Sequence, residues 1–180
     1  MRATIIFLFC LLCAFHLTAQ VRYSEKGQAM PSATQHFGKE AFVPSNQTVI
    51  RWLGNAGFFI NSRGTCIMVD PLLIGFDMPL LIEPPILLEE VPALDVILIT
   101  HSDNDHFSIL TCEQLAAVCQ EYHSTLYVDS LMKHLRLPSF GHSLTDTFQI
   151  KDIAVSLTPA WHTWQNEFGG FDHVFQREDY

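Results

Sequence analysis

Four side chains of the types that bind metal ions occur within six residues near the middle of the chain. They are His101, Asp103, Asp105 and His106, in the segment Thr100-His101-Ser102-Asp103-Asn104-Asp105-His106-Phe107. Imidazole and carboxylate groups together suit zinc, manganese or iron, and such a tight cluster repels itself unless water or a cation offsets its charge. The spacing therefore favours a divalent metal site over the alternative, a polar turn that caps a helix beginning at Ser108.

The elements around this cluster place it at the end of a buried strand. Residues 96–100 form a continuous apolar run of strand length, which is typical of strands covered on both faces. Open α/β sheets bind ligands at the carboxyl ends of such strands. A helix is expected to follow over residues 108–123, because its apolar residues recur with helical spacing and Ser108 is a suitable cap.

The remaining patterns predict an α/β fold with a mixed sheet. Before the cluster, three short segments separated by turns predict an antiparallel meander with strands at residues 48–53, 58–60 and 65–70. After the helix we expect a strand at 126–128, a helix at 130–137 and a hairpin formed by 148–150 and 153–158. Residues 72–92 are strongly apolar yet contain four prolines, which predicts an irregular lid, pocket wall or contact surface.

Composition and charge narrow the classes of function. The chain has 180 residues, of which 48% are hydrophobic and 16% charged, and this excludes an intrinsically disordered protein. The formal net charge of −9 and the lack of any basic run argue against a nucleic-acid partner. Three cysteines follow residue 20, namely Cys66, Cys112 and Cys119, and we expect buried thiols rather than a disulfide framework. Cys112 and Cys119 should lie two turns apart on one helix face.

The N-terminus has the three-part layout of a secretory signal peptide. A positive start is followed by an apolar run from Ile5 to Phe15 and by a cleavage site after Ala19. The run is too short to cross a bilayer, so no transmembrane span is expected after cleavage. We therefore expect a signal peptide at 1–19, an extended leader at 20–47, a domain at 48–180 and a secreted or periplasmic location.

Four motifs in order resemble the metallo-β-lactamase fold family. His-x-Asp-x-Asp-His after an apolar strand is similar to the family signature His-x-His-x-Asp-His. The segment at 52–60, Asp70-Pro71 and the segment at 158–162 resemble the branch that contains ascorbate-6-phosphate lactonase and the N-acyl-phosphatidylethanolamine phospholipase D type. The resemblance covers residues 52–162. It implies the αββα sandwich, of which this chain would hold only the N-terminal half, a mixed sheet with flanking helices.

The resemblance also implies roles for individual residues. His101 and His162 would hold a first metal, together with Asp103 where the family usually has a second histidine. Asp105 and His106 would hold a second metal, and Asp105 would also orient or deprotonate the attacking water. Asn55 and Asp70 would lie next to these ligands near the pocket without binding the metal themselves. One or two divalent ions, zinc, manganese or iron, would be the cofactor.

The family fold has two similar halves, and the chain ends where the second half would begin. We therefore expect an exposed sheet face that predisposes the chain to self-association. The leading hypothesis is an exported metal-dependent hydrolase whose metal-activated water attacks a phosphodiester, a lactone or a related, lipid-like ester. The alternatives are a non-catalytic metal-binding remnant that lacks half of the active site, and a partner-binding module that uses residues 72–92.

Overall fold

The computed structural model describes residues 22–23, 29–30, 33–76, 80, 82–162, 166 and 172–180. The chain forms two compact units, Met1–Ala33 and Thr34–Tyr180. In the first unit, β1 (Arg22–Tyr23) pairs antiparallel with β2 (Ala29–Met30). The expected signal peptide at residues 1–19 lies outside the described residues, so its cleavage remains a prediction.

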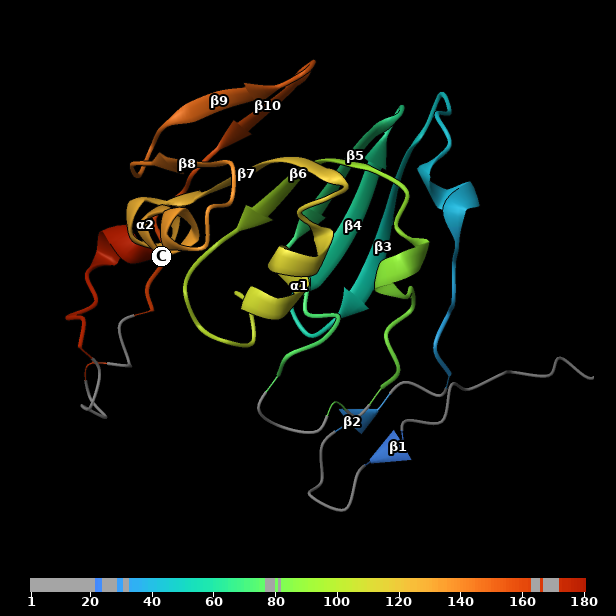
Figure 1. Cartoon of the computed structure of the whole chain (residues 1–180), viewed down its shortest axis with the longest axis horizontal. Helices are drawn as coiled ribbons and strands as arrows, with labels where there is room; N and C mark the ends of the chain where they lie inside the picture. Colours follow the sequence, from blue (N-terminus) through green and yellow to red (C-terminus); the bar gives the residue numbers. More distant parts are fainter. Residues whose placement is uncertain are drawn as a thin grey trace, which may run out of the picture. The chain divides into compact units, whose positions relative to one another are not determined.

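A six-stranded mixed sheet forms the centre of the second unit (Figure 1). Its order follows the chain: β3 (Thr48–Gly54), β4 (Gly57–Ser62), β5 (Thr65–Val69), β6 (Leu94–Ile99), β7 (Cys119–Thr125) and β8 (Ser139–His142). The first three strands are antiparallel and the later neighbours are parallel. This arrangement confirms the predicted meander and the α/β class with a mixed sheet.

Two helices cover one face of this sheet. They are α1 (Ile109–Leu115), whose first turn is capped by the Ser108 hydroxyl accepting from the Thr111 amide, and α2 (Leu126–His134). Their buried side chains pack with Phe59, Met68, Ile97 and Tyr122 in the main core. Within the described residues, no helix is long and apolar enough to cross a membrane.

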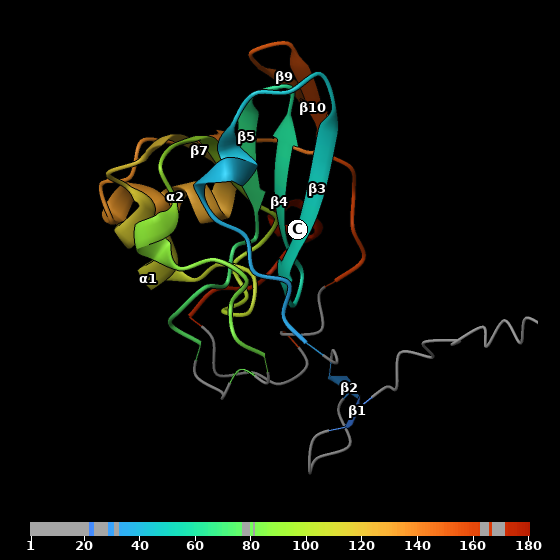
Figure 2. The same cartoon turned by 90° about the vertical axis from the view of Figure 1, so that its right-hand side faces the viewer.

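A hairpin packs against the opposite face of the sheet (Figure 2). Its strands are β9 (Thr147–Ile150) and β10 (Ile153–Ser156), joined by Lys151 and Asp152 as predicted. Ile150 packs there with Ile67 and Val96 of the sheet. The expected open face is thus partly covered, while Ile50, Trp52 and Phe58 remain exposed on β3 and β4. Self-association through this face stays a prediction.

Two predicted elements between α1 and β8 are wrong. The helix expected over 108–123 ends at Leu115, and residues from Cys119 onward form β7, which pairs with strands on both sides. The strand expected at 126–128 is instead the first turn of α2, and β8 was not predicted. Helical spacing of apolar residues is ambiguous over this short stretch, and strand pairing decides the outcome.

The three cysteines of the described residues are buried and free, as predicted, although Cys119 lies on β7 and not on the helix that carries Cys112. Burial raises the pKa of the Cys66 and Cys119 thiols to about 11, so both stay protonated at neutral pH.

The expected leader at 20–47 spans two different environments. From Thr34 onward it belongs to the second unit, where Phe37 is buried and the 3-10 helix η1 (Lys39–Phe42) buries Phe42. The buried Asn61 side chain on β4 fixes this segment, because its Nδ2 donates to the carbonyl oxygens of Ala41 at 2.8 Å and Val43 at 3.0 Å. Residues 34–47 are therefore part of the packed domain.

Part of the described apolar segment after β5 belongs to the core. Leu72, Leu73, Ile86 and Val91 are buried, the last beside the 3-10 helix η2 (Leu88–Glu90). Prolines exclude a regular element here, and the Thr111 hydroxyl accepts hydrogen bonds from the backbone amides of Leu73 and Ile74. Residues 77–79 and 81 lie outside the described part of the chain, so the expectation of a lid or a contact surface remains a prediction.

Candidate metal centre

The candidate centre lies where β5 and β6 end, and the buried Asp70 carboxylate organises it. Its Oδ1 accepts from the Thr100 amide at 2.8 Å, and its Oδ2 accepts from the Thr100 hydroxyl at 2.7 Å and from His106 Nδ1 at 2.9 Å. Asp70 itself adopts a left-handed backbone with φ +43°, which turns the chain sharply before Pro71. The three donors hold the loop after β6 against the end of β5.

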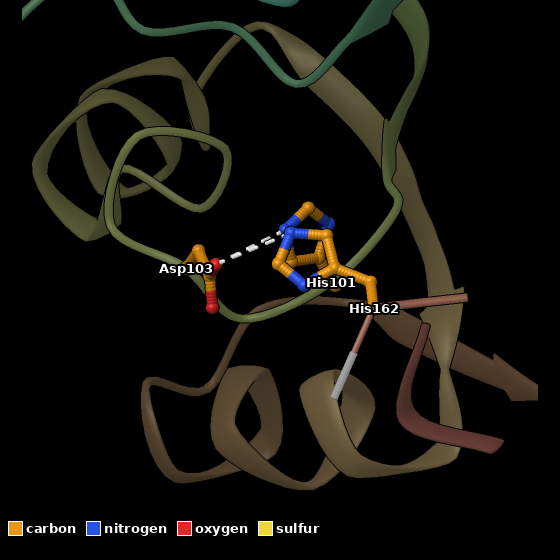
Figure 3. A group of neighbouring side chains, drawn as sticks. All are labelled: His101, Asp103 and His162. Atoms are coloured by element: carbon orange, nitrogen blue, oxygen red, sulfur yellow. Dashed lines mark ion pairs between the residues drawn. The ribbon is translucent and has the colours of Figure 1, made fainter. Parts of the chain in front are cut away.

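Three side chains converge beside this carboxylate. His101 Nε2 lies 3.4 Å from Asp103 Oδ2, and His162 Nε2 lies 3.8 Å from the same oxygen. One ligand atom from each of the three residues lies within 4.8 Å of the others. Figure 3 shows the Asp103 carboxylate facing both imidazole rings. His162 comes from the segment after β10, 59 positions beyond Asp103, so the fold brings these residues together.

The hydrogen bonds fix the tautomer of His101. The Thr100 hydroxyl gives its proton to Asp70, so it can only accept from His101 Nδ1, at 2.9 Å. Neutral His101 therefore carries its lone pair on Nε2, which points toward Asp103. Burial, together with the nearby His106, lowers the pKa of His101 despite the opposing charge of Asp103, and this favours the neutral form that binds metals.

The donor set fits a divalent metal. Ligands about 2.0–2.2 Å from a tetrahedral ion stand roughly 3.3–3.6 Å apart, close to the distances of 3.4 Å and 3.8 Å from Asp103 to the two histidines. His101 Nε2 is buried, and among the described residues it has no hydrogen-bond partner. A buried imidazole lone pair aimed at a carboxylate is costly unless a cation or a proton lies between them. Two imidazoles and one carboxylate suit zinc, iron or manganese.

Asp105 and His106 form a separate pair next to this cluster. The His106 ring lies 4.1 Å from the His101 ring, and its Nε2 is 3.9 Å from Asp105 Oδ2. The Asn55 amide donates to the Asp105 backbone oxygen at 2.6 Å and lies 3.4 Å from its Oδ2. Burial alone would lower the pKa of His106, but the hydrogen bond and charge of Asp70 outweigh it and raise the pKa. Within the described residues, no third carboxylate, histidine or cysteine joins this pair in a ligand group.

The geometry therefore gathers every residue that the sequence singled out, in two groups. His101, Asp103 and His162 share one position. Asp105 and His106 lie beside it. Asn55 is hydrogen-bonded to Asp105, and Asp70 is hydrogen-bonded to His106. The ligand and catalytic roles remain predictions.

The C-terminal segment contributes a neighbour that the sequence did not suggest. The ring of Tyr180, which follows the 3-10 helix η3 (Arg177–Asp179), stacks on His162 at 4.8 Å and lies 5.4 Å from the His101 ring. Asp179 is buried and accepts from His173 Nε2 at 2.8 Å. The polar sequence of this segment gives no sign that it packs, because its packing depends on a long-range contact between η3 and α2.

His123 of β7 and His142 of β8 form a further pair of histidines, next to the β9–β10 hairpin. His123 Nδ1 and His142 Nε2 are 2.7 Å apart, and both rings stack on Phe148 of β9, at 4.4 Å and 3.9 Å. His123 is buried on β7.

This pair predicts a loss of stability in mild acid. Burial and the charge of His123 lower the pKa of His142, against the opposite effects of Asp146 and Asp129. Below about pH 6.5, His142 therefore takes up a proton more readily in the unfolded chain than in the folded one. The contribution of neutral His142 to the free energy of unfolding is complete above that pH and is lost as the pH falls. Urea midpoints should drop less between pH 7.5 and 5.5 in His142→Gln than in the wild type.

The control removes an exposed histidine at the end of α2. The urea midpoint of His134→Gln should change with pH as that of the wild type does, because His134 is exposed at the end of α2. The other histidines contribute equally in the wild type and in both variants. Equal slopes for the wild type and His142→Gln would contradict the prediction.

The fold and the cluster define the class of protein, an α/β domain with a histidine and carboxylate centre at the end of a mixed sheet. The family model described as Beta-lactamase superfamily domain matches residues 49–177, most of the described second unit. The chain therefore belongs to the β-lactamase superfamily.

Curated relatives include bacterial proteins named as metal-dependent hydrolases. A UPF0173 metal-dependent hydrolase of Lawsonia intracellularis is 27% identical over 123 residues, which is 64% of this chain and 50% of the relative. A UPF0173 metal-dependent hydrolase of Myxococcus xanthus is 29% identical over 143 residues, covering 77% and 47%. The chain spans about half the length of these relatives.

Solved structures share the fold at low sequence identity. Igni18, a metallo hydrolase of Ignicoccus hospitalis, has a TM-score of 0.52 and 21% identity, covering 64% of this chain and 50% of that chain. CmlA, a diiron β-hydroxylase of Streptomyces venezuelae, has a TM-score of 0.52 and 20% identity, covering 63% and 24%. The likeness extends the family assignment to the three-dimensional fold.

Proposed function

We propose that this chain carries the metal-binding part of an exported hydrolase that cleaves a phosphodiester, a lactone or a related ester. The observation that carries the proposal is the convergence of His101, Asp103 and His162 on one point beside a buried carboxylate. The names of the relatives, metal-dependent hydrolases, agree with it. Export rests on the sequence of residues 1–19 alone, and the narrower lactonase and phospholipase D branch rests on the motifs at 52–60 and 158–162.

The chain's own residues have distinct parts in this proposal. His101, Asp103 and His162 would hold a zinc, iron or manganese ion, and such an ion would supply a water of lowered pKa, about 7. Asp105, partly exposed and held by Asn55, would orient the attacking water or take its proton. Asp70 holds His106 through Nδ1, which leaves its Nε2 on the side of Asp105.

The test measures metal content and turnover on the same sample. Full-length protein is purified by gel filtration with zinc, manganese or iron supplied, and elemental analysis gives the metal bound per chain. Bis-(p-nitrophenyl) phosphate, p-nitrophenyl butyrate and a simple lactone are then assayed with and without a chelator. At least one tightly held metal and chelator-sensitive turnover on one of the three would support the proposal. No bound metal, or turnover that the chelator leaves unchanged, would overturn it.

One observation favours a second candidate, a metal-binding domain without activity. Among the described residues, Asp105 and His106 supply only two ligands for a second ion. This candidate predicts one metal per chain and no turnover of any of the three substrates.

A further inference from the structure

The turn between β3 and β4 reaches the loop that carries Asp105. Its two central residues are Asn55 and Ala56, and Asn55 has a left-handed backbone with φ +47°, which asparagine tolerates better than most residues do. Asn55 Nδ2 donates to the backbone oxygen of Asp105 at 2.6 Å and to its Oδ2 at 3.4 Å. One amide group therefore holds both the backbone and the carboxylate of Asp105.

The carboxylate oxygen that Asn55 contacts is also the one that faces His106. Asp105 Oδ2 lies 3.4 Å from Asn55 Nδ2 and 3.9 Å from His106 Nε2. The Asp105 side chain is 39% exposed, so packing alone does not fix the direction of its carboxylate. The contact with Asn55 therefore selects an orientation in which Oδ2 lies on the side of His106.

Trp52 fixes the backbone of Asn55 from the end of β3. Its indole Nε1 donates to the Asn55 carbonyl oxygen at 2.7 Å. Gly57 lets the other side of the turn lie against the end of β5, since a Cβ atom there would stand 3.0 Å from the Asp70 carbonyl oxygen. Because Asn55 is exposed, water competes for its side-chain amide, and a fixed backbone reduces the entropy cost of its contact with Asp105.

We propose that Trp52 is a positioning residue of the hydrolase and that it acts through Asn55 on the Asp105 carboxylate. This inference rests on the proposed function, in which Asp105 would orient the attacking water or take its proton. The hydrogen bonds that carry it join β3, the turn after it and the loop after β6. Removing the indole donor is expected to loosen that loop while the residues that would bind the metal stay unchanged.

The first experiment needs no turnover. Hydrogen exchange of the full-length protein, at matched metal content, is followed at the amides of His106 and Phe107, which close the turn around Asp105 by donating to the Asp103 backbone oxygen at 2.9 Å and 2.7 Å. Trp52→Phe keeps an aromatic ring and removes the donor. It should speed exchange of these amides about three- to tenfold, the effect of one ordinary hydrogen bond.

The matched control is Phe58→Leu. Phe58 lies opposite Trp52 on β4, and this change removes an aromatic ring without removing a side-chain hydrogen bond. Exchange of the two loop amides should therefore stay as in the wild type. Thermal melting shows whether each variant folds.

A double-mutant cycle tests whether Trp52 acts through Asn55. Asn55→Gly removes the side-chain amide, and glycine adopts the positive φ of this position without strain. This variant should speed exchange in the loop more than Trp52→Phe does. Adding Trp52→Phe to it should change exchange by less than about twofold, because the contact that the indole supports is already gone. A merely structural role for Trp52 predicts instead that the two effects multiply.

The second experiment uses the ester that the metal-loaded protein hydrolyses. Trp52→Phe should lower kcat about three- to tenfold, and Asn55→Gly should lower it about 100-fold, because Asp105 loses its orientation for proton transfer. KM, and the affinity of the first metal measured by chelator competition, should stay within about twofold of the wild type.

The two experiments separate failure of this inference from failure of the hydrolase. Three results would overturn the positioning role: unchanged exchange in Trp52→Phe, effects that multiply in the double variant, or a loss of turnover that a parallel loss of metal affinity explains. Coupled changes in exchange without turnover of any ester would support the link from Trp52 to Asp105 and count against the proposed reaction.

Discussion

Replacing His101 by alanine is expected to abolish metal binding at the candidate centre. His101 is buried, its Nε2 is directed at Asp103, and its tautomer is fixed by Thr100. Removing this imidazole leaves only Asp103 and the more exposed His162 at the first position. We expect a loss of affinity well beyond the 10- to 100-fold that follows loss of a mere outer-sphere partner. Competition with a chromogenic chelator and elemental analysis after gel filtration measure it, and any chelator-sensitive ester hydrolysis should disappear with the metal.

A matched control separates loss of a ligand from loss of a histidine. His134→Ala removes an exposed imidazole at the end of α2, where Nδ1 contacts the Ser130 backbone oxygen, and should bind metal as the wild type does. Thermal melting of both variants without metal confirms that they fold. If His101→Ala retains the metal of the wild type, the three-residue centre is wrong.

Local sequence was sufficient to predict the part of this centre that lies on one loop. An apolar run followed by His101, Asp103, Asp105 and His106 identifies both a strand and the loop after it, and the structure places that loop at the end of β6. His162 is different, because no ligand spacing or secondary-structure pattern around it distinguishes it from other histidines. Its place was expected only through a resemblance to a family, and the fold brings it to within 3.8 Å of Asp103.

The errors have a common physical origin. Residues 108–137 contain apolar side chains at spacings that suit a helix and short strands, so the period alone does not locate the boundary. β7 exists because β6 and β8 pair with it on both sides, and these pairings are long-range contacts invisible in a local window. The burial of His123 also depends on long-range contacts, because Phe140 of β8 and Phe148 of β9 both stack on its ring.

Asp70→Asn is expected to weaken the centre without touching a ligand. Asp70 Oδ2 accepts from the Thr100 hydroxyl and from His106 Nδ1, and Thr100 in turn fixes the tautomer of His101. In Asp70→Asn, an amide NH₂ group in place of Oδ2 is itself a donor, so it cannot accept from the Thr100 hydroxyl or from His106 Nδ1. His106 and His101 can then no longer both keep their Nε2 lone pairs free. Metal affinity should fall about 10- to 100-fold.

The same substitution should also lower the free energy of unfolding by about 1–3 kcal/mol, because a buried acceptor is lost. The control must therefore be a variant that is also destabilised by loss of a carboxylate acceptor, and Asp95→Asn is such a variant. Asp95 accepts from the Cys66 amide at 2.8 Å and pairs with Lys151, away from the candidate ligands. Urea denaturation should show both variants destabilised, whereas chelator competition should show weakened metal binding in Asp70→Asn alone. Equal metal affinities in the two variants would mean that Asp70 stabilises the fold and does not orient the histidines. A selective loss would mean that one buried carboxylate at the end of β5 sets the protonation pattern of two histidines.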